Sequence, residues 1–196
     1  MRFHVGPIPE SGTFAPAEQG WEAMREPNPL LMQLVALPFL ALGVGLTVIA
    51  IIEFTNIDLR LLTPTRFLSI CLILVPAHEL IHAACYPRNQ PSSDALIGFW
   101  PRRLLFYAHF DGPMRRNRFV AVLLAPTLAL TAVPVALAAC AGFASPLIAG
   151  VAVVNSAFAY GDLFGAFLVA IQVPRTAWVR NKGWRTYWRS KAPDAN

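Results

Sequence analysis

The sequence predicts an all-α membrane protein with about four transmembrane helices and one short β-hairpin in the loop between the second and third helices. Of the 196 residues, 56% are hydrophobic and only 14% are charged, which lies outside the usual balance of a water-soluble domain. Four stretches are also long enough to cross a hydrocarbon core of about 30 Å, which takes roughly 20 apolar residues in a helix. We therefore expect the lipid bilayer to surround most of the chain.

The apolar stretches define the expected organisation. We predict transmembrane helices over approximately Leu30–Ile52, Arg66–Tyr86, Phe119–Gly142 and Leu147–Val173. Residues 1–29 then form an N-terminal tail, residues 30–173 a four-helix transmembrane domain, and residues 174–196 a basic, aromatic tail. We expect the four helices to pack as one bundle, because no internal repeat or second domain is apparent.

The distribution of basic residues predicts how the helices are oriented. The loop between the second and third helices and the C-terminal tail each carry six Lys or Arg residues, whereas residues 144–146, between the third and fourth helices, carry none. Because cytoplasmic loops are enriched in Lys and Arg, we expect a multi-pass protein of the cell membrane with both termini and the second loop in the cytoplasm. The net charge of +5 is attributed to this asymmetry, so no nucleic-acid partner is expected.

Aromatic residues alternate with cations in the C-terminal tail, where Trp178, Trp184, Tyr187 and Trp188 lie among six basic residues. This composition favours a segment at the membrane surface, with the rings at the level of the lipid headgroups and the charges in water. A nucleic-acid-binding stripe is the less favoured alternative.

The second loop contains a segment with strand-like composition. Residues 95–110 are rich in Leu, Ile, Phe, Tyr and Trp and are interrupted by Pro101, Arg102 and Arg103, which predicts a hairpin of two short strands. Such a hairpin could simply cover the membrane interface, or its edge could pair with an extended substrate. The sequence leaves both roles open.

A metal-binding motif lies within the second predicted helix. His78, Glu79 and His82 follow the HExxH pattern, in which the two histidines lie one turn apart on one helical face and can reach one zinc ion. Glu79, on the neighbouring face, can act as the general base for an attacking water. Near the middle of an apolar span a charged carboxylate costs on the order of 3 kcal/mol, and such residues usually serve function. A satisfied polar cluster without metal is the alternative.

Catalytic zinc sites commonly have three protein ligands, so a third ligand is needed. No Glu follows Glu79 in the chain, and the extended HExxHxxGxxH pattern is not matched. Asp162 lies in the apolar run of the fourth predicted helix, at a depth similar to that of the two histidines. We therefore expect zinc to be bound by His78, His82 and Asp162.

Asn155 is a further candidate site residue. It precedes Asp162 by seven residues, so a straight fourth helix would present both on one face. We assign Asn155 to substrate binding, where its amide could hydrogen bond to a substrate backbone; it could equally bond to a metal ligand or to a neighbouring helix.

The region from Arg66 to Val173 resembles two related groups of membrane proteins. Site-2 proteases have an HExxH motif on one transmembrane helix and an aspartate on a later helix, preceded by an asparagine, matching His78, Glu79, His82, Asp162 and Asn155. The sequence lacks the proline that these proteases have between the asparagine and the aspartate, and Leu163 stands where they have glycine. These departures, and the basic stretch that ends at Arg118, are more similar to a bacterial membrane family of unknown function, the putative zincin peptidases.

These observations predict an intramembrane zinc metallopeptidase that hydrolyses a membrane or membrane-associated protein, with Glu79 as the catalytic residue. Two alternatives remain. The first is a membrane protein that binds metal without hydrolysis, either a pseudoprotease or a sensor. The second is a metal-free transporter or proton relay in which Glu79 and Asp162 titrate along a polar path.

Overall fold

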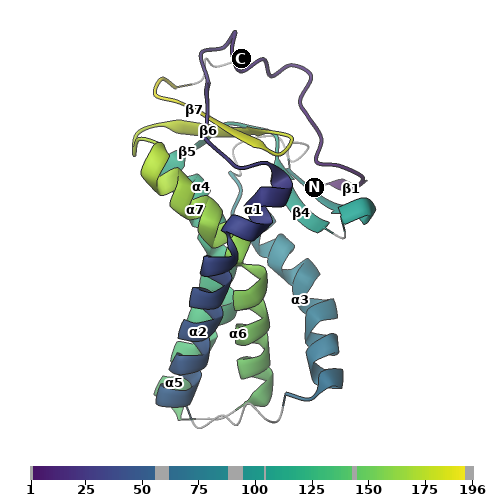
Figure 1. Ribbon diagram of the computed structural model, residues 1–196, viewed down its shortest axis with the longest axis vertical. Helices are drawn as coiled ribbons and strands as arrows, with labels where there is room; N and C mark the ends of the chain where they lie inside the picture. Colours follow the sequence, from purple (N-terminus) through teal and green to yellow (C-terminus); the bar gives the residue numbers. More distant parts are fainter. Residues whose placement is uncertain (1, 56–61, 88–94, 104, 143–144, 193–196) are drawn as a thin grey trace.

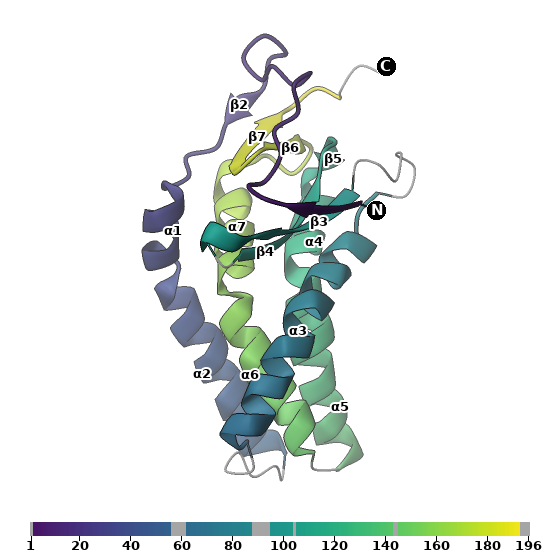
Figure 2. The same ribbon diagram turned by 90° about the vertical axis from the view of Figure 1, so that its right-hand side faces the viewer.

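The computed structural model describes residues 2–55, 62–87, 95–103, 105–142 and 145–192. The helices form an elongated bundle, and the strands gather at one end of it together with both chain termini (Figures 1 and 2). We call this end the cap; it comprises the described parts of residues 2–28, 95–115 and 174–192.

The helices follow the predicted spans closely. The chain forms α1 (Pro29–Val35), α2 (Leu37–Phe54), α3 (Pro64–Ala84), α4 (Arg116–Thr127), the π-helix η4 (Leu128–Ala132), α5 (Val133–Ala141), α6 (Pro146–Phe158) and α7 (Tyr160–Gln172). Among the described residues, three stretches are long and apolar enough to cross a membrane: Leu30–Phe54, Pro64–Ala84 and Arg116–Ala141. A fourth is obtained when α6 and α7, which meet at an angle of 51°, are counted as one span.

The helix ends carry ordinary capping signals. The side chain of Asn28 accepts hydrogen bonds from the backbone N–H groups of Leu30 and Leu31 at the start of α1, and the side chain of Thr63 accepts from Arg66 at the start of α3. Both helices have proline in their first turn, where a missing N–H costs nothing. Gly142 ends α5 in the left-handed conformation that glycine adopts without strain.

Pro126 changes the hydrogen bonding of α4. Proline has no backbone N–H, so in a helix it leaves the carbonyl four residues earlier, here that of Val122, without its usual partner. The π-helix η4 begins two residues later, and such turns occur often at functional sites. The carbonyls of Val122 and Pro126 both accept side-chain hydrogen bonds.

The cap contains two sheets. One has the order β1-β3-β4, with β1 (Arg2–Val5) parallel to β3 (Ala95–Trp100) and β3 antiparallel to β4 (Leu105–Phe110), and the short 3₁₀-helix η3 (Pro101–Arg103) lies between β3 and β4. The other has the order β2-β7-β6-β5, formed by Glu22–Ala23, Arg185–Arg189, Trp178–Lys182 and Met114–Arg115. The predicted hairpin is confirmed, whereas the prediction of an otherwise all-α chain is incomplete because both tails add strands.

The C-terminal tail folds into the cap. β6 and β7 form a hairpin that pairs with β5 on one side and β2 on the other. The ring of Trp178 lies under the guanidinium of Arg115 at 4.4 Å, and Tyr187 packs edge-on against Phe14. This strand pairing of the tail was not predicted, because its partners lie far away in the sequence.

Candidate metal centre

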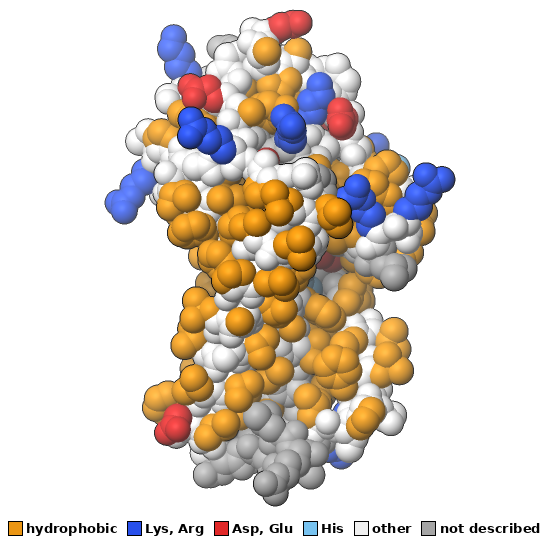
Figure 3. Space-filling model, in the orientation of Figure 1, with side chains coloured by type: hydrophobic (Ala, Val, Ile, Leu, Met, Phe, Trp, Pro, Cys, Tyr) orange, Lys and Arg blue, Asp and Glu red, His pale blue; other side chains and the backbone are white. Residues whose placement is uncertain are grey.

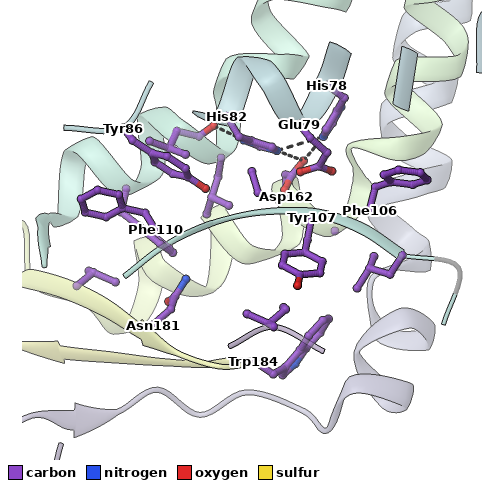
Figure 4. A pocket seen from close by; sticks show the side chains of 18 of the residues that line it. His78, Glu79, His82, Tyr86, Phe106, Tyr107, Phe110, Asp162, Asn181 and Trp184 are labelled. Carbon is purple, nitrogen blue, oxygen red and sulfur yellow. Dashed lines mark hydrogen bonds and ion pairs between the residues drawn. The ribbon is translucent and has the colours of Figure 1, made fainter. Parts of the chain in front are cut away.

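Three potential ligand atoms converge where α3 meets the bend between α6 and α7. Asp162 Oδ2 lies 2.9 Å from His78 Nε2 and 3.3 Å from His82 Nε2, and the two Nε2 atoms lie 3.2 Å apart (Figure 4). Ligands placed tetrahedrally at 2.0–2.1 Å from a zinc ion lie about 3.3 Å from one another. Within the part of the chain that the structure describes, this is the one group of three or more His, Cys, Asp or Glu residues suited to a metal.

The imidazole of His82 is held in one tautomer. Its Nδ1 lies 2.8 Å from the carbonyl oxygen of Val122, which can only accept a hydrogen bond. Nδ1 must therefore carry the proton and donate, and in the neutral ring Nε2 has a free lone pair. The acceptor is the carbonyl that Pro126 leaves without its usual helical partner.

His78 is held in the same way by Asn155. The amide nitrogen of Asn155 donates to the carbonyl of Pro126 and to the hydroxyl of Thr131, each at 3.0 Å. This fixes the amide orientation, so that its oxygen accepts from His78 Nδ1 at 2.9 Å. The Nε2 atom of a neutral His78 therefore also points a lone pair toward Asp162. Metal-binding histidines are usually oriented through their other ring nitrogen in this manner.

The donor set fits a cation. With both rings neutral, two imidazole lone pairs and one carboxylate oxygen lie within 3.3 Å of one another, where they repel unless a proton or a metal cation lies between them. Two nitrogen ligands and one oxygen ligand are typical of zinc, and three protein ligands leave a position open for water or substrate. The site residues therefore fit zinc in number, type and spacing.

The bend between α6 and α7 separates two residues that the sequence suggested would share one helical face. Asn155 is in α6, Asp162 is in the first turn of α7, and the break falls at Ala159. Because of this bend, Asn155 reaches the Nδ1 side of the His78 ring and Asp162 reaches its Nε2 side. Asn155 is fully buried and bonds to a candidate metal ligand, and it is not among the residues that line the adjacent cavity.

The depth of the site differs from the expectation. His78 and His82 lie in the last two turns of α3, about 9 Å and 3 Å of helical rise from its end at Ala84, and not near the middle of the span. The cap covers this end of the helix. In Figure 3 a recess beneath the cap exposes acidic and His side-chain atoms.

A buried polar network supports the site from the bundle side. Thr131 bonds to Asn155, and the hydroxyl of Ser156 contacts that of Thr131 at 3.4 Å and that of Thr47 at 2.7 Å. All four side chains are buried. The network joins α2, η4 and α6 to the imidazole of His78, and sequence reasoning missed its hydroxyl members, although polar residues in apolar spans were a usable signal.

A cavity of about 330 Å³ adjoins the three ligand atoms. Glu79 lines it beside His78 and His82, with its carboxylate facing the backbone N–H of Ala108 in β4. Figure 4 shows Glu79 on the same side of α3 as the ligand atoms. The carboxylate therefore lies where a general base for an attacking water is needed.

Tyr86 was not predicted as a site residue. It follows His82 by one turn and lines the cavity, and its ring packs against Phe110 at 5.2 Å. A tyrosine phenol carries its proton at neutral pH and can donate a hydrogen bond. The i+4 spacing after His82 was a signal that could have found it.

Arg118 fixes the end of the helix that carries these residues. Its guanidinium donates to the carbonyls of Cys85 and Tyr86 at 2.7 and 3.3 Å, which satisfies groups that the end of α3 leaves unpaired. Because Arg118 belongs to α4, this contact also sets the position of α3 relative to Val122.

The cap supplies the opposite wall of the cavity through Ile8, Asn181 and Trp184, in addition to residues of β4. The side-chain oxygen of Asn181 and the indole nitrogen of Trp184 are buried, and neither has a hydrogen-bond partner among the described residues. Sequence reasoning did not identify these residues as site residues, because only long-range strand pairing brings them to the metal ligands.

Comparison with known proteins gives one family. A family model described as "Putative zincin peptidase" matches residues 71–178, more than half of the chain. No curated protein and no solved structure matches. The matched region begins in α3 before His78 and ends at the start of β6, so it contains Glu79, all three candidate ligands and Asn155. The chain therefore belongs to the putative zincin peptidase family.

Proposed function

We propose that the protein is a membrane-embedded zinc metallopeptidase that cleaves peptide bonds where its helical bundle meets the cap. The single observation that carries the proposal is the convergence of His78 Nε2, His82 Nε2 and Asp162 Oδ2, with both imidazoles oriented through Nδ1. Membership of the zincin peptidase family supports the same chemistry.

Zinc bound by these three atoms would supply a positive charge that activates water and polarises the scissile carbonyl. The protein side chains transfer the proton and stabilise the developing negative charge. Glu79 accepts a proton from the attacking water and returns it to the leaving amine. Tyr86 donates its phenolic hydrogen to the oxygen on which negative charge develops, in the manner of an oxyanion hole.

The free edge of β4 is suited to an extended substrate. In the order β1-β3-β4, β4 has no partner on its outer side among the described strands. The N–H of Ala108 faces Glu79, and backbone groups alternate in direction along an antiparallel strand, so Phe106 and Phe110 direct theirs to the same edge. A peptide paired with this edge would run past Glu79 with its backbone exposed to attack.

The location of the site suggests its substrates. The ligands lie at one end of helices long and apolar enough to cross a membrane, so we propose a membrane or membrane-associated protein as substrate. A transmembrane substrate would have to unwind locally to present a peptide bond. The basic residues of the cap support a cytoplasmic location for the site.

Metal analysis tests the site. We expect about one zinc per chain in the purified wild type and a loss of at least tenfold in His78→Ala and Asp162→Asn. His109→Gln is the matched control, because His109 is equally buried but lies in the cap outside the cluster. A folded wild type that stays metal-free and cannot be reloaded would contradict the proposal and favour the proton relay.

Activity variants test the chemistry separately. Glu79→Gln should keep zinc and lose peptide hydrolysis, and Tyr86→Phe should keep zinc with kcat lowered by about 10–100-fold. The assay is cleavage of co-reconstituted membrane-protein substrates, followed by mass spectrometry. A zinc-loaded wild type that cleaves no more than Glu79→Gln across such substrates would favour the metal-binding pseudoprotease or sensor.

A further inference from the structure

One face of the β1-β3-β4 sheet is apolar throughout. Directly paired residues share a face, and the register pairs Phe3 with Ile97, Val5 with Phe99, and Phe99 with Phe106. The rings of Phe99 and Phe106 stack at 4.4 Å. We call these five residues, Phe3, Val5, Ile97, Phe99 and Phe106, the apolar shelf.

The shelf faces the bundle side of the cap. The same sheet face continues along β4 to Ala108 and Phe110, which belong to one hydrophobic cluster with Tyr86, just after α3, and Val122 of α4. Figure 4 shows Phe106 and Phe110 on the α3 side of β4 and Tyr107 on the opposite side. Tyr107 donates to the carbonyls of Gly6 and Pro7 in the cap. The two faces of the sheet therefore meet different surroundings.

Much of the shelf is exposed. Phe3 is 68% exposed, Val5 61% and Phe106 37%. On the other face of the sheet, His109 and Tyr107 of β4 are buried. This is the reverse of the pattern in a sheet that faces water, where the exposed face is polar.

The shelf continues the exposed apolar surface of the bundle. Exposed apolar residues run along α3 as Leu72, Ile73 and Leu80, the last of which is one turn from the end of the helix. In Figure 3 hydrophobic side chains cover the height of the bundle and extend onto the lower part of the cap, whereas most visible Lys and Arg side chains lie on the cap.

Basic residues stand at the tip of the hairpin. Arg102 and Arg103 are exposed in the turn between β3 and β4. The guanidinium of Arg103 lies 4.5 Å from the centre of the Trp100 ring. Tryptophan and arginine side by side at the border of an apolar surface match the headgroup layer, where rings sit at the interface and cations meet phosphates.

We propose that the apolar shelf and the Arg102–Arg103 tip form a binding surface for the lipid interface, with the shelf residues in the acyl-headgroup boundary and the two arginines on anionic headgroups. The exposed apolar area, its continuity with α3 and the basic tip together favour lipid over a protein partner. The inference goes beyond the proposed peptidase activity and does not depend on it.

This surface also adjoins the candidate site. Phe106 belongs to the shelf and lines the cavity beside the metal ligands, and Ala108 in the same strand faces Glu79. Lipid binding to the shelf therefore holds β4, the proposed substrate edge, at a set height relative to the bilayer.

Photo-crosslinking in nanodiscs tests the proposal on the full chain. Benzoylphenylalanine replaces Phe3 in one sample, Val5 in a second and, as control, the exposed Glu22 of the other sheet in a third. The nanodiscs contain phosphatidylcholine alone or a mixture with phosphatidylglycerol, and intact-mass spectrometry identifies the adducts. The sites were chosen because their exposure allows replacement without loss of packing.

We expect at least tenfold more lipid adduct from Phe3 and Val5 than from Glu22. In the mixture, phosphatidylglycerol should be enriched among the adducts beyond its share of the bilayer, and Arg102→Gln with Arg103→Gln should return that ratio to the bulk value. Equal yields at all three sites, or adducts mainly to a second protein chain, would overturn lipid binding by the shelf. Enrichment unchanged in the double variant would overturn the role of the two arginines.

Discussion

The bundle and the cap contribute opposite walls of the same cavity, but their folds depend on interactions of different range. The helices of the bundle are stabilised by hydrogen bonds between residues four apart and by apolar faces that the sequence displays directly. The cap depends on distant pairs, such as Arg2 with Leu96 and Glu22 with Trp188. The comparison teaches that the metal ligands follow from local patterns, whereas the substrate-facing wall follows from long-range pairing.

The interiors of the two regions also differ in chemistry. The end of the bundle away from the cap is packed with small and aliphatic residues around Ile51 and Ala138. The buried polar groups of the bundle are concentrated nearer the metal ligands. The cap relies on arginines stacked on aromatic rings, for example Arg180 on Phe14 and Arg189 on Trp21. Variants in the bundle should therefore change metal binding, and variants in the cap should change stability or substrate handling.

The largest effect in this comparison is expected from Asn155→Leu in the bundle. The change removes the acceptor for His78 Nδ1, so zinc affinity should fall by about 10–100-fold. Competition with a chromogenic chelator measures the affinity. Thr47→Val is the matched control, since Thr47 belongs to the same network and, among the described residues, hydrogen bonds to Gly43 and Ser156 and not to Asn155 or His78. Equal affinity in both variants would show that the orientation of His78 does not depend on Asn155.

A smaller effect is expected from Gly98→Ala in the cap. An added Cβ would overlap the Tyr107 ring, which crosses directly over Gly98. The ring must shift away from Gly6 and Pro7, and we expect a loss of about 1 kcal/mol in cap stability, measured by thermal unfolding, with zinc content unchanged. Gly45→Ala is the control because a Cβ there meets nothing within 4 Å. Loss of zinc in Gly98→Ala would contradict the division between the two regions.

The smallest effect concerns pH. Burial lowers the pKa of His109 in the cap, although the nearby Asp111 acts in the opposite direction. The unfolded chain therefore binds a proton at His109 more readily than the folded cap does. The contribution of His109 to stability should increase as the pH rises to the ordinary histidine pKa near 6.5, and it should decrease as the pH falls below that value. His109→Gln should remove this pH dependence, which we expect to change the free energy of unfolding by less than about 1 kcal/mol.

Melting curves between pH 5 and 8 measure the difference between wild type and His109→Gln. Comparison with this variant is needed because burial raises the pKa of Glu26, whose contribution to stability grows as the pH falls. A wild type and variant with parallel pH profiles would show that His109 does not titrate differently on folding.

Much of the bundle and of the candidate site could be predicted from the sequence, because hydropathy, helical spacing and the chemistry of zinc ligands are local or compositional signals. His78, Glu79, His82 and Asp162 were identified in this way, and the structure brings all four to one place. The contribution of Val122 was not predicted, because a backbone carbonyl has no residue type and becomes available only through Pro126. Ile8, Asn181 and Trp184 were missed as site residues, because no local pattern indicates strand pairing across most of the chain.

The bend at Ala159 has a consequence for how related chains should be aligned. On a straight helix, the number of residues between an amide and a carboxylate decides whether they share a face. Here the two groups belong to helices that meet at 51°, so the angle of the bend and the length of the spacer jointly decide whether both reach the same ring. A chain with one residue more or fewer between them can preserve the arrangement by bending differently. Geometry around the histidine, and not a fixed interval in sequence, is therefore the feature by which equivalent residues should be matched.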